Sequence, residues 1–180
     1  MDKTVKLHDK TFRLCIEAEE IDRAVRRVAR EINREMANER PLFLSVLNGA
    51  FMFTSDLLKE ITVEGTTVAF VRLASYAGLS PTGEVKELLG LTEGIAGRSV
   101  VIVEDIVDTG SSLAYLLKVL EGHRPRRVKI AALFYKPAAL TRDITVDYAG
   151  IALENDFVVG RGLDYDGLGR NLPDLYTLVS

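Results

Sequence analysis

A short apolar run from Val100 to Val103 restricts the fold of this chain more than any other feature. Four consecutive β-branched residues indicate a strand buried on both faces, as strands are in parallel sheets. After a polar turn, Leu113, Leu116, Leu117 and Leu120 recur at helical spacing. The stretch therefore predicts a strand, a turn and a helix. Its polar turn lies at the carboxyl end of the strand, where open α/β sheets bind ligands.

The same alternation continues along the chain, because turn residues separate apolar runs of strand or helix length. Helices are predicted over residues 16–40 and 51–61. Strands are predicted over residues 42–47, 66–73, 85–91, 128–135, 145–153 and 175–179. Residues 1–15 indicate no more than an extended arm. We expect one α/β domain over residues 1–180, with a mostly parallel central sheet flanked by helices.

Composition restricts the partners and the compartment. The net charge is −3 and the only basic cluster, Arg124 to Lys129, is short, which argues against nucleic-acid and anionic-membrane partners. Cys15 is the only cysteine, so no internal disulfide can form, and His8 and His123 lack the neighbours of a metal site or a triad. The chain has neither a signal-peptide pattern nor a long apolar span, so we expect it to be cytoplasmic.

The turn after Val103 combines two kinds of polar group. Thr109 to Ser112 offer a glycine, hydroxyl groups and the free N–H groups of a helix N-terminus, which together can bind a phosphate. Glu104 and Asp105 are acceptors, so they suit hydroxyl groups or a divalent cation. The combination suits a sugar phosphate, and the P-loop pattern is absent from the sequence. The alternative without a ligand is a Ser-capped helix after a solvated acidic strand end.

The segment V-V-I-V-E-D-I-V-D-T-G-S-S, residues 100–112, resembles the phosphoribosyl-diphosphate-binding signature of type I phosphoribosyltransferases. Its D-x-x-D-T-G spacing resembles the hypoxanthine-guanine branch of that family. The resemblance implies that Asp108 is the general acid/base toward the purine ring nitrogen, and that Glu104 and Asp105 hold the ribose hydroxyls. The residues that would bind the 5′-phosphate are Thr109, Gly110, Ser111 and Ser112.

A second strand-turn-helix unit contains the turn Asn48-Gly49-Ala50. Taken alone, this is an ordinary turn between a strand and a helix. The resemblance implies that Asn48 and Gly49 bind the diphosphate through backbone N–H groups, often next to a cis peptide, here between Leu47 and Asn48. Some relatives carry a lysine where Asn48 stands, so one cationic contact to the diphosphate is absent here.

Two further positions gain a role through the resemblance. Residues 74–84 form a long Gly/Ser/Pro-rich segment, which by itself is equally well an exposed linker. Its Ser75-Tyr76 pair resembles the flexible loop that closes over the substrates and excludes water. Lys136 follows a predicted strand and precedes a proline, where a lysine is often simply solvated. In the family, a lysine at this place donates to the exocyclic oxygen of a 6-oxopurine.

The motif F-V-V-G-x-x-L-D-Y, residues 157–165, is similar to another family signature, although an aromatic next to β-branched residues is by default core. The resemblance implies that Phe157 stacks on the purine and that Val158 reads the ring edge through its backbone. Asp164 would border the purine site and help to hold the magnesium diphosphate. Arg170 would pair with the diphosphate oxygens, as guanidinium groups do.

The resemblance implies a Mg²⁺-dependent transfer of the phosphoribosyl group from phosphoribosyl diphosphate to hypoxanthine or guanine. We expect a core at residues 42–155 and a small hood made of the N-terminal segment and residues 156–180. The metal ligands would be Glu104, Asp105 and Asp164. A homodimer or homotetramer is expected. The alternatives are a xanthine-preferring enzyme with the same chemistry and a regulatory protein that senses the ligand while binding RNA or DNA.

Overall fold

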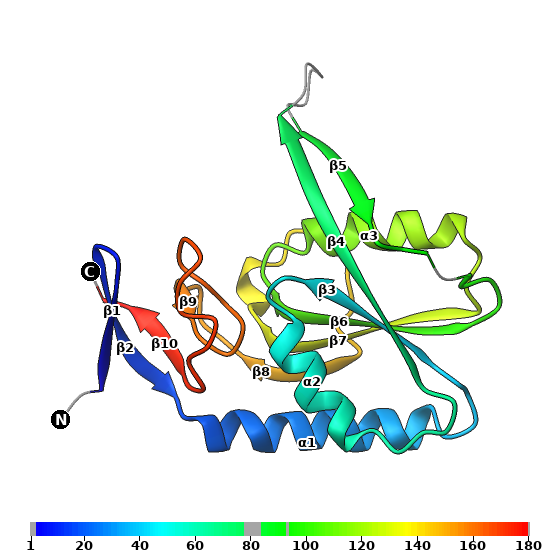
Figure 1. Cartoon of the computed structure of the whole chain (residues 1–180), viewed down its shortest axis with the longest axis horizontal. Helices are drawn as coiled ribbons and strands as arrows, with labels where there is room; N and C mark the ends of the chain where they lie inside the picture. Colours follow the sequence, from blue (N-terminus) through cyan, green and yellow to red (C-terminus); the bar gives the residue numbers. More distant parts are fainter. Residues whose placement is uncertain (1–2, 78–83, 93, 180) are drawn as a thin grey trace.

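The computed structural model describes residues 3–77, 84–92 and 94–179, and these residues form a large sheet, a small sheet and the helices that cover the large one (Figure 1). The helices are α1 (Ala18–Glu35), α2 (Phe51–Glu60) and α3 (Ser111–Gly122), with a short 3-10 helix η1 (Pro137–Ala139). No helix in these ranges is long and apolar enough to span a membrane.

The large sheet has the strand order β5-β4-β3-β6-β7-β8. Its strands are β3 (Leu42–Leu47), β4 (Thr67–Ala77), β5 (Glu84–Leu89), β6 (Ser99–Val107), β7 (Arg127–Tyr135) and β8 (Tyr148–Ala152). The parallel strands are β4, β3, β6, β7 and β8, and β5 pairs with β4 in the antiparallel direction. This is the mostly parallel α/β sheet that the sequence predicts.

Strand β6 lies at the centre of the core, between β3 and β7. Side chains alternate across a strand, and Val101 and Val103 accordingly pack in the cluster that contains the buried faces of α1 and α2. Val100 and Ile102 pack in the other cluster, with α3. The prediction that this apolar run is buried on both faces is therefore confirmed.

The small sheet joins the two ends of the chain. Its order is β1-β2-β10-β9, all antiparallel, with β1 (Thr4–Leu7), β2 (Lys10–Ile16), β9 (Val158–Val159) and β10 (Leu175–Leu178). Phe12, Val159 and Tyr176 form its buried core. The expectation of an extended arm at residues 1–15 is wrong, because β1 and β2 form a hairpin that pairs with β10. We call this sheet, with the loop of residues 160–172, the hood.

Several predicted boundaries shift, and for β6 the reason is pairing with a strand that is distant in the sequence. Strand β6 continues to Val107, because Glu104 pairs with Ala132 and Ile106 with Phe134 of β7. Glu104 and Asp105 therefore lie on the strand and not in the turn. Two elements are shorter than predicted, namely α1, which was predicted over 16–40, and β8, which was predicted over 145–153.

The predicted long loop also starts later than expected. Residues 74–77 continue β4 and pair with residues 84–87 of β5, so that Ser75 faces Lys86 and Tyr76 faces Val85 in the register. Ser75 and Tyr76 are thus strand residues. The rest of the predicted loop, residues 78–83, lies outside the described residues.

Candidate functional site

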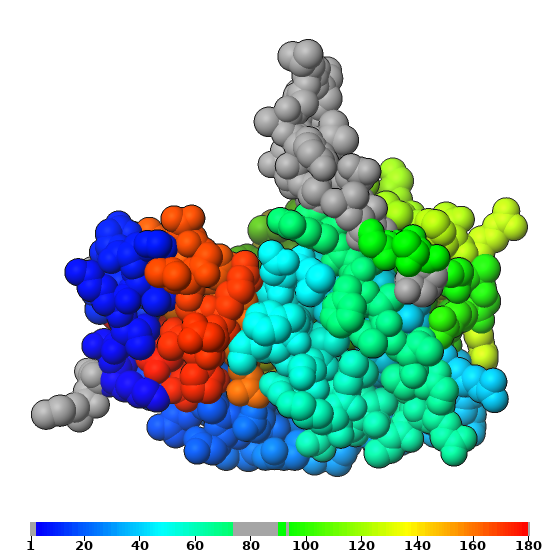
Figure 2. All heavy atoms as spheres, viewed as in Figure 1, coloured from blue at the N-terminus to red at the C-terminus, as the bar shows by residue number. Residues whose placement is uncertain are grey.

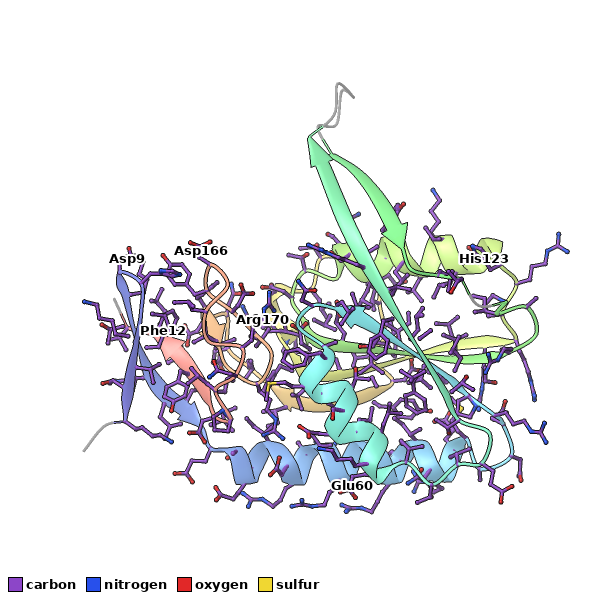
Figure 3. The ribbon with its side chains drawn as sticks, in the orientation of Figure 1. Asp9, Phe12, Glu60, His123, Asp166 and Arg170 are labelled. Atoms are coloured by element: carbon purple, nitrogen blue, oxygen red, sulfur yellow. The ribbon has the colours of Figure 1, made fainter. Side chains whose placement is uncertain are left out.

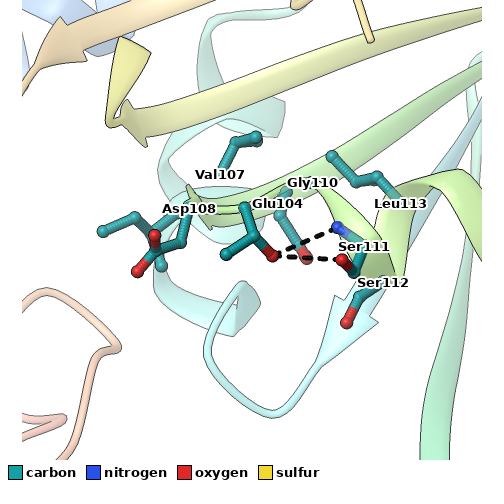
Figure 4. A pocket seen from close by; sticks show the side chains of 9 residues that line it. Glu104, Val107, Asp108, Gly110, Ser111, Ser112 and Leu113 are labelled. Atoms are coloured by element: carbon teal, nitrogen blue, oxygen red, sulfur yellow. Dashed lines mark hydrogen bonds between the residues drawn. The ribbon is translucent and has the colours of Figure 1, made fainter. Parts of the chain in front are cut away.

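A cavity of about 110 Å³ opens where β6 ends and α3 begins (Figure 4). It is smaller than the roughly 300–1,000 Å³ that encloses a whole small ligand, so it suits a single group such as a phosphate. The cavity lies at the carboxyl end of a central parallel strand, as the sequence predicts. Its lining residues are Glu104, Ile106, Val107, Asp108, Thr109, Gly110, Ser111, Ser112 and Leu113.

The floor of this cavity is the turn from Asp108 to Ser112. Gly110 has a φ of 79° and directly precedes α3, so the turn requires the left-handed conformation that glycine adopts without strain. The Thr109 hydroxyl oxygen accepts the Ser111 N–H at 3.4 Å and donates to the Ser111 hydroxyl at 3.3 Å (dashed in Figure 4). Both distances exceed the usual range for hydrogen bonds. A ligand oxygen can therefore replace these weak contacts.

A segment that the sequence analysis missed borders the same turn. The Thr141 N–H donates to the Thr109 carbonyl oxygen at 3.1 Å, and Arg142 Nε lies 3.4 Å from the Ser111 hydroxyl oxygen. Arg142 thus adds a cation next to the predicted phosphate site. It follows η1 and is 31 positions from Ser111 in the chain. No local pattern relates residues that far apart.

Glu104 and Asp105 are consecutive residues near the end of β6, and both are partly buried. Burial raises the pKa of Glu104 well above its ordinary value, and the charge of Asp105 adds to the shift. Burial also raises the pKa of Asp105 to about 6, although the Ile106 N–H, which donates to Asp105 Oδ1 at 2.7 Å, opposes this. Both carboxylates are therefore easily protonated until hydroxyl donors or a cation stabilise their charge.

This shift predicts how pH acts on stability. Because the folded chain holds the Asp105 proton up to about pH 6 whereas the ordinary value is 3.8, the folded state is favoured at low pH and loses stability as the pH rises through that window. At 1.36 kcal/mol per unit, the loss is about 3 kcal/mol at most. Asp105→Asn should remove it, so urea unfolding at pH 4 and pH 8 should differ less in the variant than in the parent.

The exposed Asp166 provides the control for this comparison. Asp166→Asn is measured by urea unfolding at the same two pH values. An Asp105→Asn variant with the full pH dependence of the parent would show that this carboxyl is not the group that titrates.

Asp105 also touches the second predicted turn. The Leu47–Asn48 peptide is cis, as the resemblance led us to expect. A Cβ added to Gly49 would lie 1.6 Å from Asp105 Oδ2, and a Cβ added to Gly162 would lie 2.1 Å from the Gly49 carbonyl oxygen. Gly49 is therefore packed between the β6 carboxylate and the hood loop, and neither glycine can carry a side chain without movement of its neighbours.

Gly49→Ala should for this reason destabilise the fold by about 1–3 kcal/mol, the usual cost of overpacking. Most of the loss should disappear in the Asp105→Ala background, where the clashing carboxylate is gone. Gly122 is the matched control, because a Cβ there meets nothing within 4 Å. Denaturant unfolding of the single and double variants measures the coupling. Equal losses from Gly49→Ala in both backgrounds would contradict the contact.

Asp108 and Lys136 form an ion pair across the ends of β6 and β7. Lys136 Nζ lies 3.1 Å from Asp108 Oδ2, and the lysine side chain is 8% exposed whereas that of Asp108 is 49% exposed. The Lys136 N–H also donates to the Val107 carbonyl oxygen at 2.9 Å. The two residues predicted to contact the purine are thus brought together, with the donor buried and the acceptor open to a ligand.

The hood loop brings two more predicted residues to this edge of the sheet. Arg170 Nη2 lies 2.7 Å from Asp164 Oδ1, and Arg170 Nη1 donates to the Gly162 carbonyl oxygen at 2.8 Å. The charges of Arg170 and Asp164 both act on the pKa of Asp105, so the loop lies near this carboxylate of β6. Figure 3 labels Arg170 on the side of the loop toward the large sheet.

The predicted purine-stacking residue stands at the edge of the hood. Phe157 is 47% exposed and has aromatic neighbours, with ring centroids 6.2 Å from Phe12 and 6.0 Å from Tyr165. Val158 is buried in β9. A half-exposed ring supported by two others is free to stack on a planar ligand.

The predicted metal ligands do not form a metal cage by themselves. Within the part of the chain that the structure describes, no three His, Cys, Asp or Glu side chains are close enough to hold a metal ion. Asp105 and Asp164 are near enough to influence each other electrostatically. Such a carboxylate pair fits Mg²⁺, which usually binds through one or two carboxylates together with substrate phosphates and water.

Comparison with known proteins gives a consistent result. A family model described as phosphoribosyl transferase domain matches residues 16–166. The hypoxanthine-guanine phosphoribosyltransferase of Lactococcus lactis is 39% identical over 162 residues, which are 89% of this chain and 87% of that protein. A bifunctional protein TilS/HprT of Listeria monocytogenes is 36% identical over 93% of this chain, but the chain spans only 26% of its length.

Solved structures agree with these relatives. A hypoxanthine-guanine phosphoribosyltransferase from Bacillus anthracis superposes with a TM-score of 0.85 at 32% identity, over 92% of this chain and 98% of that one. A hypoxanthine phosphoribosyltransferase from Trypanosoma cruzi, in a ternary substrates complex, also reaches 0.85, at 31% identity over 92% and 94% of the two chains.

Proposed function

The chain belongs to the phosphoribosyltransferase family, and we propose from this premise that it transfers the 5-phosphoribosyl group of phosphoribosyl diphosphate to hypoxanthine and guanine. The proposal rests on the arrangement of polar groups at one edge of the large sheet. There a phosphate-sized cavity and the carboxylates of β6 lie next to a buried lysine paired with a half-exposed aspartate. The products are the purine nucleotide and diphosphate, which is the chemistry of purine salvage.

The residues around the cavity hold the sugar from one side. The 5′-phosphate accepts hydrogen bonds from the N–H and hydroxyl groups of Thr109 to Ser112. Glu104 and Asp105 accept from the ribose hydroxyls, and their raised pKa values fall when these donors arrive. The sugar is then anchored while its bond to the leaving group breaks.

The diphosphate lies on the opposite side of the sugar. Backbone N–H groups of the Asn48-Gly49 turn and the guanidinium of Arg170 hold it, and Asp164 would help to hold Mg²⁺ there. Mg²⁺, when bound, neutralises charge that develops on the leaving diphosphate. The close contact between Gly49 and Gly162 supports this arrangement, since it keeps the turn and the hood loop at a set distance.

The purine lies between Phe157 and the Asp108–Lys136 pair. Lys136 donates to the 6-oxo group and the backbone of Val158 reads the ring edge. The imidazole nitrogen of the base attacks the anomeric carbon as the carbon–diphosphate bond breaks, and Asp108 accepts the proton that this nitrogen releases. The 3.1 Å separation of Asp108 and Lys136 supports the proposal, because one planar ring can contact both.

Three expectations remain predictions. Ser75 and Tyr76 are proposed to close over the substrates and exclude water. The cytoplasmic location rests on the sequence alone. A homodimer or homotetramer is supported by the exposed apolar side chains of Phe51, Val68 and Phe70. These residues belong to α2 and β4, two elements that lie on the face shown in Figure 2.

A product assay tests the proposed function directly. Phosphoribosyl diphosphate and Mg²⁺ are offered with hypoxanthine, guanine, xanthine or adenine in parallel, and nucleotide and diphosphate are measured. We expect hypoxanthine and guanine to react. If xanthine reacts fastest, the protein is instead a xanthine-preferring enzyme. If no base gives nucleotide, the result favours a ligand-sensing protein.

A further inference from the structure

Arg161 stands at a variable position of the hood motif, between Gly160 and Gly162, and has an unusual conformation. Its φ is 50°, and the flanking glycines have φ values of 107° and 104°. A side chain larger than glycine rarely adopts the left-handed region, so the surroundings must hold it there. Arg161 is also only 7% exposed. A buried, strained arginine in a loop that carries site residues requires an explanation.

The guanidinium of Arg161 connects the hood loop to both helices on one face of the large sheet. Nη2 contacts Asp22 of α1 and lies 2.9 Å from Asp56 Oδ2 of α2, and Nη1 donates to the Pro173 carbonyl oxygen at 3.3 Å. The Nε–H is buried and has no hydrogen-bond partner among the residues that the structure describes. One side chain thus bridges three segments that are far apart in the sequence.

The connection to α2 matters because α2 begins directly after the Asn48-Gly49 turn. The hood loop touches this unit twice, through Gly162 against the Gly49 carbonyl oxygen and through Arg161 against Asp56. The same loop carries Asp164 and Arg170. The two contacts therefore determine how far Arg170 lies from the backbone of the turn.

We propose that Arg161 is a positioning residue, which holds the hood loop against α2 and so fixes the spacing between the Asn48-Gly49 turn and the Asp164–Arg170 pair. The inference rests on the proposed function, in which the Asn48-Gly49 turn and Arg170 both hold the diphosphate. Arg161 itself touches no substrate. Its effect reaches the donor only through the loop.

Stability alone explains the arrangement poorly. Burying charges costs free energy that their attraction often fails to recover, and a buried N–H without a partner adds to that cost. The Asp22 side chain is 43% exposed, so solvent weakens that part of the bridge. What the bridge supplies is a defined geometry between three segments.

Arg161→Met removes the bridge and keeps an unbranched apolar side chain, and Arg161→Lys keeps a charge that can reach one aspartate. The matched control is Arg127, which bridges Glu35 and Glu39 at 3.5 and 3.3 Å. Its buried Nε also lacks a hydrogen-bond partner within the described part of the chain. It lies at the amino end of β7, away from the candidate site. Donor binding is measured by calorimetry with Mg²⁺, kcat and KM by the product assay, and stability by urea unfolding.

We expect Arg161→Met to raise the Kd and the KM of phosphoribosyl diphosphate about tenfold with kcat changed less than about threefold, as loss of ground-state positioning does. Arg161→Lys should recover part of the affinity. Arg127→Met should lose stability without losing donor affinity. Should Arg161→Met fail to fold, Asp56→Asn cuts the same bridge at α2 and is measured in the same way.

Unchanged donor affinity in the Arg161 variants, or in Asp56→Asn when it replaces them, would overturn the inference. An equally large loss of donor affinity in Arg127→Met would also overturn the inference. The effect of Arg161→Met would then reflect a general loss of stability. The parent chain is measured alongside. If it neither binds the donor nor forms nucleotide, the proposed function fails, which is a different result from a parent that binds and variants that bind equally well.

Discussion

Asp108→Asn should lower turnover about 10²–10⁴-fold, the range of general acid–base catalysis, with donor affinity nearly unchanged. The amide keeps the shape of the side chain and an oxygen that can accept from Lys136, 3.1 Å away in the parent chain. It cannot accept the proton that the purine nitrogen releases. The expected loss is therefore in kcat and not in the binding of phosphoribosyl diphosphate.

Single-turnover kinetics with hypoxanthine, next to calorimetric titration with the donor, separates these two quantities. Asp166→Asn serves as the control, because that carboxylate is exposed on the hood loop. Turnover of Asp108→Asn within a few fold of the parent would remove Asp108 from the chemistry. A large loss of donor affinity would instead assign the residue to sugar binding.

The second large effect is discrimination against adenine, which should be essentially inert. Lys136 is a donor without acceptor capacity, and it is 8% exposed. A 6-oxopurine offers it an acceptor, whereas adenine presents an amino group that can only donate. Sites built around a buried hydrogen bond reject the wrong partner by up to about 10⁴–10⁵. We expect a ratio of this size between the kcat/KM values of hypoxanthine and adenine.

Lys136→Ser should reduce that ratio, mainly by slowing the reaction of hypoxanthine, since a hydroxyl can donate or accept. Lys129→Ser is the matched control. Lys129 also forms an ion pair with an aspartate, Asp147, at 2.9 Å, but at the opposite end of β7. Comparable kcat/KM values for adenine and hypoxanthine in the parent chain would disprove both the role of Lys136 and the preference for 6-oxopurines.

Much of the candidate site could be predicted because it is contiguous. The carboxylates, Asp108 and the phosphate turn all lie within residues 100–112, where the apolar run predicts a buried strand and the leucines predict a helix. Lys136 also follows an apolar run, but its role came from the resemblance, because a lysine at the end of a strand is often simply solvated. Local periodicity predicts the place of a polar group that directly follows a strand or helix, and it does not predict the role of that group.

Two of the predictions that failed involve pairing between distant segments. Glu104 and Asp105 interrupt the apolar pattern, yet β6 continues through them because β7 supplies hydrogen bonds on that side. The N-terminal hairpin could not be predicted either, since β2 is completed by β10, more than 150 positions later. No window of local sequence contains both partners of such a pair.

By itself, therefore, the sequence determined the α/β class, the central strand and the polar groups at its carboxyl end, because these depend on the order of apolar and polar residues over short stretches. Only the tertiary structure decided what faces those groups. The contact of Asp105 with Gly49, the approach of Arg142 to Ser111 and the bridge from Arg161 to Asp22 and Asp56 join residues of different elements. Such contacts form only when the whole core packs, since burial and not local preference brings these residues together.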